Sequence, residues 1–88
     1  MPENERQSKY EEGRLAARRM VAMNVTELRI ARGWSQAELA RRSAVRETEV
    51  ADVEAGIGDM FIDTLSLLAN GLNVDISCLF RNRTDSMH

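Results

Sequence analysis

The chain has 88 residues, of which 43% are hydrophobic and 30% are charged. This length fits one small domain near the lower limit at which a single core supports a fold, so oligomerisation is a reasonable expectation. The single cysteine, Cys78, excludes a disulfide framework and a thiolate metal site within one chain. The only histidine is His88, and neither a metal-spaced cluster nor a glycine-rich phosphate loop occurs. We therefore expect no enzyme, no cofactor and no metal site.

The formal net charge of -2 hides two halves of opposite sign. Residues 13–43 carry seven arginines against two glutamates, whereas residues 44–80 carry one arginine against seven acidic residues. The basic half can meet phosphate and the acidic half cannot, so the two halves favour different partners. No apolar stretch approaches the ~20 residues needed to span a bilayer and no signal-like leader opens the chain. A cytoplasmic protein with no membrane partner is expected.

The first third of the chain is expected to be a polar arm followed by helix. The opening residues are polar and predict a flexible arm through about Lys9. From Tyr10 to Arg32 good helix formers dominate, and this predicts one long helix or two helices that meet near Asn24, a possible N-cap. Four apolar residues share one face at spacings of three and four: Ala17, Val21, Val25 and Leu28. Gly33 is typical of a helix end.

Two short helices are expected next. In the stretch SQAE, Ser35 is placed to cap a helix and Glu38 to complete a capping box, which predicts a helix from Gln36 to about Arg42. After the tight connection SAV, a third helix is expected from about Glu47 to Glu54 and should end at Gly56. Its inward residues should be Val45, Val50 and Val53.

The last helices should close the core. Asp59 is a plausible cap for a helix over residues 61–72, which Asn73 should end in the left-handed conformation. Its apolar stripe consists of Ile62, Leu65, Leu68 and Leu72. A final helical turn, capped by Asp75, should bring Leu79 and Phe80 into the core. Five helices without strands predict an all-α fold, with residues 1–23 as arm and helical extension, 24–80 as the domain and 81–88 as a disordered tail.

Three ungapped stretches between Leu28 and Phe80 carry a resemblance to a known family: LRIARGWSQAELARRSAV, a helix ending VEAG, and DTLSLLANGLNVDISCLF. They resemble the phage-repressor-like helix-turn-helix family, the XRE type that includes lambda repressor and Cro. The resemblance implies a five-helix lambda-repressor-like DNA-binding domain, here with an N-terminal helical extension. In that family the second helix crosses the DNA backbone and the third lies in the major groove.

The resemblance also implies roles for individual residues. Ser35 and Gln36 fall where the second helix meets phosphate. The positions that usually read bases are Arg46, Glu47, Thr48 and Asp52. Phosphate could be met by Arg32, Arg41 and Arg42, and by an N-terminal arm carrying Arg14 and Arg18. Arg29 and Glu54 align with a structural ion pair between the first and third helices, and Trp34 with a core position.

The acidic third helix departs from this pattern and leaves two functions open. Glu47 and Glu49 lie in its first turn, where negative charge stabilises a helix, but Asp52 lies beyond it. A carboxylate can still accept a hydrogen bond from cytosine. The leading hypothesis is a transcriptional regulator that binds double-stranded DNA as a homodimer.

The alternative hypothesis is a degenerate helix-turn-helix module that binds a protein partner instead of DNA. The partner would meet the acidic third helix and an apolar patch in the loop that follows it. The candidate patch residues are Ile57, Met60 and Phe61. They either form an exposed surface, which would signal a protein partner, or tuck under the fourth helix.

Overall fold

The computed structural model describes residues 2–82, with side chains from residue 8 onward. Its elements are α1 (Pro2–Ala31), α2 (Gln36–Ser43), α3 (Glu47–Ala55), α4 (Ile62–Leu72) and a 3-10 helix, η1 (Ile76–Phe80). The described part contains no strand, so the all-α prediction is confirmed, although the fifth helix is a single 3-10 segment. The tail expected at 81–88 lies outside the described residues from 83 onward.

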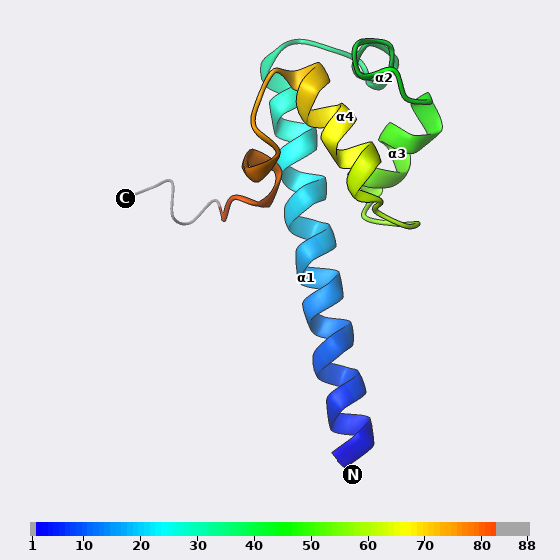
Figure 1. Cartoon of the computed structure of the whole chain (residues 1–88), viewed down its shortest axis with the longest axis vertical. Helices are drawn as coiled ribbons and strands as arrows, with labels where there is room; N and C mark the ends of the chain where they lie inside the picture. Colours follow the sequence, from blue (N-terminus) through cyan, green and yellow to red (C-terminus); the bar gives the residue numbers. More distant parts are fainter. Residues whose placement is uncertain (1, 83–88) are drawn as a thin grey trace.

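Helix α1 is continuous and much longer than the other elements (Figure 1). Its C-terminal half packs against α3, α4 and η1, whereas its N-terminal half extends away from them. The predicted flexible arm through Lys9 is wrong, because the helix already begins at Pro2. A break at Asn24 is also not observed, and the boundary expected between residues 23 and 24 lies inside one helix.

Asn24 has a different role from the N-cap that its residue type suggested. Its side chain is buried, and Nδ2 donates to the carbonyl oxygens of Leu79 at 2.8 Å and Arg81 at 2.9 Å. These carbonyls lie at and beyond the end of η1, where the helix leaves them without partners. Asn24 therefore fastens the C-terminal segment to α1.

Local sequence signals set most of the other helix ends. The Ser35 hydroxyl accepts from the Glu38 N–H at 3.0 Å, and Asp75 caps η1 through the Ser77 N–H at 2.9 Å. Asn73 ends α4 with φ 59, as predicted. The Asp59 cap is wrong: α4 begins after Phe61, in extended backbone with no side-chain cap bond.

The core lies where the four α-helices and η1 meet. Its buried apolar residues are Val21, Val25, Leu39, Ala40, Val50, Val53, Leu65, Leu68, Ala69, Leu72 and Leu79. Trp34 and Val45 pack against this core from its edge. Two residues predicted to face inward do not: Ile62, at the first position of α4, is 61% exposed, and Phe80, at the end of η1, is 44% exposed.

Candidate nucleic-acid interface

Helices α2 and α3 form a helix-turn-helix unit whose outer face carries the predicted base-reading residues. The turn passes through Ala44, which has φ 57 in place of a glycine. The α3 residues Val50 and Val53 are buried. The helical period then turns the opposite side outward, and Arg46, Glu47, Thr48 and Asp52 are all exposed. Thr48 and Asp52, four residues apart, share the side of α3 opposite the buried valines, while Glu47 and the N-cap residue Arg46 are exposed at the start of the helix.

Glu49 belongs to the fold and not to this outer surface. Its Oε1 accepts from the Arg46 N–H at 3.1 Å, and its Oε2 accepts from the Thr64 hydroxyl at 3.3 Å. The first contact satisfies a backbone donor at the start of α3, and the second ties α3 to α4. One of the acidic residues of α3 is therefore explained by helix capping.

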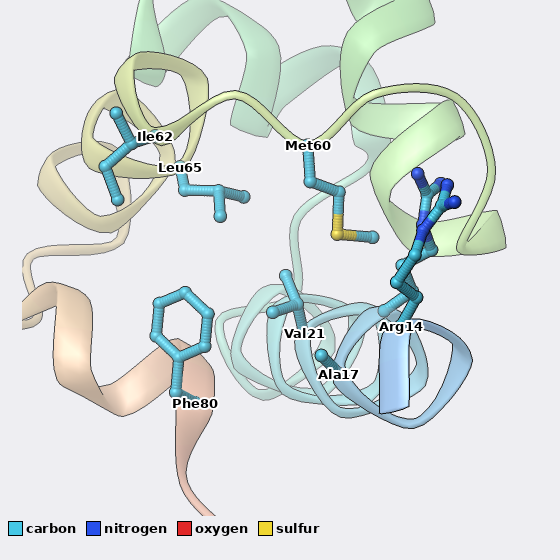
Figure 2. Close-up of a pocket in the computed structure, with 8 residues that line it drawn as sticks. Arg14, Ala17, Val21, Met60, Ile62, Leu65 and Phe80 are labelled. Carbon is cyan, nitrogen blue, oxygen red and sulfur yellow. The ribbon is translucent and has the colours of Figure 1, made fainter. Parts of the chain in front are cut away.

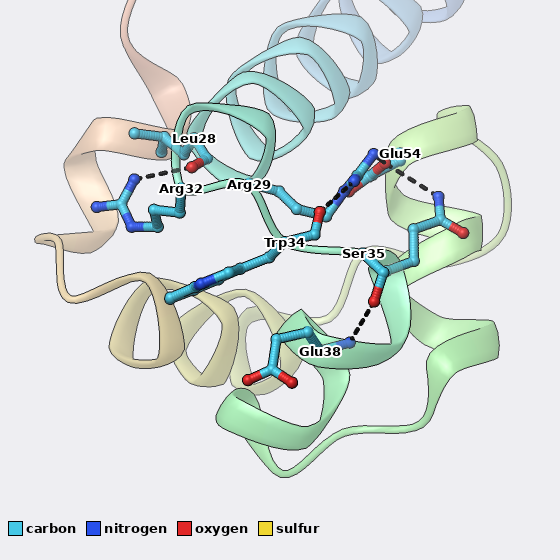
Figure 3. A network of polar contacts seen from close by, with 8 residues as sticks. Leu28, Arg29, Arg32, Trp34, Ser35, Glu38 and Glu54 are labelled. Atoms are coloured by element: carbon cyan, nitrogen blue, oxygen red, sulfur yellow. Dashed lines mark hydrogen bonds and ion pairs between the residues drawn. The ribbon is translucent and has the colours of Figure 1, made fainter.

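Arg29 and Glu54 form a bidentate ion pair that joins α1 to α3 (Figure 3). Arg29 Nε lies 2.6 Å from Glu54 Oε2 and Nη2 lies 2.9 Å from Oε1, while Nη1 donates to the Trp34 carbonyl at 2.7 Å. The two side chains are only 15% and 6% exposed. This pair, implied by the resemblance, holds the angle of α3 against α1.

The surroundings of Glu54 keep it ionised. Burial raises its pKa, but hydrogen bonds from Arg29 and Gln36, with the charge of Arg29, outweigh this effect and leave the pKa below its ordinary value. Gln36 Nε2 donates to Glu54 Oε1 at 3.0 Å. The side chain expected to meet phosphate is thus engaged in linking α2 to α3. Sequence reasoning did not identify this contact.

Arg32 is held by backbone carbonyls. Its Nη1 donates to the Leu28 carbonyl at 2.8 Å and its Nη2 to the Leu72 carbonyl at 2.7 Å. The second contact satisfies an acceptor at the C-terminus of α4 and joins that helix to α1. Two of the five guanidinium donors of Arg32 are thus engaged within the fold, and its expected contact with phosphate stays a prediction.

The arginines of α2 lie on its exposed side. Both Arg41 and Arg42 pair with the Glu38 carboxylate, Arg42 Nε at 2.6 Å, and the hydrogen bond from Arg41 is the main reason that the pKa of Glu38 is lowered. The predicted capping box is therefore only half formed, because Glu38 turns to these arginines. Arg42 also lies 4.1 Å from the centroid of the Trp34 ring, a cation–π contact.

The two arginines of the expected N-terminal arm face the loop between α3 and α4. Arg18 donates to the Gly58 carbonyl, and Arg14 pairs with Glu11 at 3.6 Å. The arm is helical, and Arg18 holds the loop in place. In that loop Ile57 is 56% exposed and Phe61 is 64% exposed, whereas Met60 packs against the core. Two of the three patch residues, Ile57 and Phe61, thus form exposed surface, whereas the third, Met60, tucks against the core.

Other kinds of site find no support in the described part of the chain. Among residues 8–82 no group of histidine, cysteine and carboxylate side chains is arranged to hold a metal ion. None of the described helices is long and apolar enough to cross a membrane. Cys78 is half-buried, with Arg81 Nη2 at 3.8 Å from its sulfur.

The family model HTH_3, described as helix-turn-helix, matches residues 25–77. The chain belongs to the helix-turn-helix family. The match spans the region from the middle of α1 to η1, which holds the α2–α3 unit and its ion pair. Membership of this family supports a DNA-binding regulator of the XRE type. No curated protein matches it significantly.

Solved structures of helix-turn-helix proteins resemble the chain closely. A hypothetical transcription factor from Neisseria, NHTF, shares 28% identity at a TM-score of 0.76, over 81% of this chain and 82% of that one. The restriction-modification controller protein C.AhdI from Aeromonas hydrophila shares 31% sequence identity at a TM-score of 0.70, and the match covers 74% of this chain and 98% of that one. An HTH_3 family transcriptional regulator from Vibrio cholerae shares 26% sequence identity at a TM-score of 0.75, and the match covers 83% of this chain but 41% of that one.

Proposed function

We propose that this helix-turn-helix protein is a sequence-specific transcriptional regulator that binds operator DNA as a homodimer, with α3 of each protomer in the major groove. The observation that carries the proposal is the exposed row at the start and along the outer side of α3, which consists of Arg46, Glu47, Thr48 and Asp52. Pairs of half-sites about 34 Å apart follow from the two-fold symmetry of such a dimer. The similarity to a restriction-modification controller protein supports a regulator.

The chemistry of the row suggests what it reads. Arg46 can donate two hydrogen bonds to guanine O6 and N7, and its guanidinium has no ion-pair partner among the described residues. Glu47 and Asp52 can accept from the amino group of cytosine, and Thr48 can contact the methyl group of thymine. A site rich in G·C pairs fits this set best.

Phosphate contacts would come from α2. Its first turn presents backbone N–H groups and the positive end of the helix dipole beside Ser35 and Gln36. Arg41 and Arg42 on the exposed side add one net positive charge after pairing with Glu38. These contacts would position the protein on the duplex without reading its sequence.

The first test is fluorescence anisotropy of a labelled random duplex at several salt concentrations. Binding should weaken with salt, with a log–log slope near -0.9 per phosphate contact. Arg41→Gln should weaken this binding and make the slope shallower, whereas Arg81→Gln, an equal charge change beyond η1, should leave both unchanged. Absence of binding at low salt by folded protein would contradict the proposal.

A second candidate function rests on the exposed Ile57 and Phe61, which follow the acidic α3 in sequence. An exposed apolar pair with the acidic residues Asp59 and Asp63 nearby in sequence fits a basic, amphipathic protein segment. On that view the domain keeps its fold but binds a protein instead of DNA. Loss of DNA binding at all salt concentrations would favour it over the regulator.

A further inference from the structure

The face of α1 that enters the core continues toward the N-terminus without cover. Ala22 and Val25 are buried, and the same heptad-like spacing of four and three leads back to Arg18, Leu15 and Glu11. Residues 8–17 are all exposed, and Leu15 is 46% exposed. A helix segment without tertiary contacts is only marginally stable in water, so this stretch gains stability from a partner.

Open grooves run beside this uncovered face. One, of about 420 Å³, lies between α1 and the loop after α3, and its lining includes Glu11, Leu15 and the exposed Ile57. The second, of about 330 Å³, is lined by Val21 from α1 and by Met60 and Phe80 (Figure 2). Arg14 and Arg18 line both, so the two grooves adjoin along α1. An apolar side chain from a second helix could enter either groove.

Apart from Arg14, which pairs with Glu11 of its own helix, the charges on this stretch are arranged symmetrically about Leu15. Glu11 and Glu12 precede it by four and three residues, and Arg18 and Arg19 follow it by three and four. In an antiparallel pair of identical helices with the two-fold axis near Leu15, each acidic pair therefore lies opposite the basic pair of the other copy. A parallel pair would place like charges together.

From this geometry we propose that a second copy of the chain docks here, its α1 lying antiparallel along the first. Leu15 of each protomer fills the groove beside Ile57 of the other, and the acidic and basic pairs flank the contact. Arg18 keeps its bond to the Gly58 carbonyl, since a guanidinium has five donors and can also meet a carboxylate. The inference rests on the proposed dimeric regulator and assigns its interface.

Sedimentation velocity of the full chain over a range of concentrations tests the interface. Leu15→Ala should raise the dimer Kd by about tenfold or more, because each dimer loses two leucine side chains. Leu67→Ala is the matched control: Leu67 is an exposed leucine of α4 that lines neither groove, so the Kd should not change. Circular dichroism checks that both variants stay folded.

Charge reversal tests the antiparallel arrangement directly. Glu12→Arg and Arg19→Glu should each weaken self-association about tenfold or more at low salt, while an equimolar mixture of the two should form heterodimers. The double variant in one chain should recover the wild-type Kd. Both residues are exposed and outside the core, so the swaps spare the fold.

Three results would overturn this assignment. They are a wild-type chain that stays monomeric, a dimer that tolerates Leu15→Ala and the charge swaps, and a dimer that is weakened by Leu67→Ala instead. The measurement of binding to a random duplex distinguishes failure of the proposed interface from failure of the proposed DNA-binding function. A chain that binds DNA with the expected salt dependence but fails here remains a regulator with a different interface or none.

Discussion

A Cβ atom built on Gly71 of α4 would lie 2.0 Å from the Ser43 Oγ and 3.0 Å from the Ser43 Cα of α2. The two helices meet here at backbone distance, so Gly71→Ala forces them apart. We expect the free energy of unfolding in urea to fall by about 1–3 kcal/mol. Gly13→Ala in α1, where nothing lies within 4 Å, should instead raise it by about 0.5–1 kcal/mol. Equal effects at both glycines would argue against the close approach.

The Ser43 hydroxyl should contribute little to stability. It is buried, and Oγ has no hydrogen-bond partner among the described residues. Ser43→Ala removes an unsatisfied polar atom, so the free energy of unfolding should stay the same or rise by up to about 1 kcal/mol. Urea denaturation measures this change. A loss above about 1 kcal/mol would show that the hydroxyl is hydrogen-bonded in solution.

The pair between Arg29 and Glu54 should be the costliest ion pair to break. Glu54→Ala leaves a nearly buried guanidinium without its carboxylate, and the free energy of unfolding should fall by about 3–5 kcal/mol. The control is Glu38→Ala, which removes the partner of two exposed arginines and should change stability little. If both substitutions cost the same, the Arg29 pair would not be the tie between α1 and α3.

The low pKa of Glu54 predicts loss of stability in acid. A carboxylate whose pKa is lower in the folded state stabilises the fold fully above its unfolded value of about 4.5, and this contribution disappears as pH falls through the folded pKa. The Tm of the wild type should therefore fall steeply below about pH 4.5. Glu54→Gln should start from a lower Tm and show a flatter decline over the same range. Parallel profiles would assign the acid sensitivity to other carboxylates.

The exposed carboxylates of α3 should oppose general DNA affinity and serve specific recognition. Replacing Glu47 with Gln and Asp52 with Asn removes two negative charges from the row proposed to face DNA, so binding to a random duplex should tighten about two- to tenfold at low salt. Discrimination between a selected operator and random DNA should decrease at the same time. Anisotropy titrations with both duplexes measure the two effects. Unchanged random-duplex affinity would indicate that α3 does not face DNA.

The sequence predicted features that depend on near neighbours or on the family pattern. Ser35 as a cap, Asn73 as a helix end and the pairing of Arg29 with Glu54 are all confirmed. The partners of Gln36, Asn24 and Arg32 were missed, since they lie 18, 55 and 40 residues away and depend on how the helices pack. A polar side chain can form hydrogen bonds with residues near it in sequence or with residues on another helix. Local sequence patterns predict only the first kind of partner.

The N-terminal region shows a related limit. Its polar composition suggested a flexible arm, yet polar residues such as glutamate, glutamine and lysine are good helix formers, and α1 begins at Pro2. The composition of a segment indicates whether its side chains can form a hydrophobic core. It does not indicate whether a helix formed by the neighbouring residues continues through that segment.

Because α1 has no break between Leu15 and the buried Val25, the two positions are locked in helical phase. Each residue added between them would turn the N-terminal half by about 100° and lengthen it by about 1.5 Å. An insertion of one residue therefore swings Leu15 to another side of the molecule, whereas an insertion of seven restores its direction about two turns further out. Unbroken α1 acts as a rigid spacer, so the register of this helix sets where its N-terminal half points relative to α3.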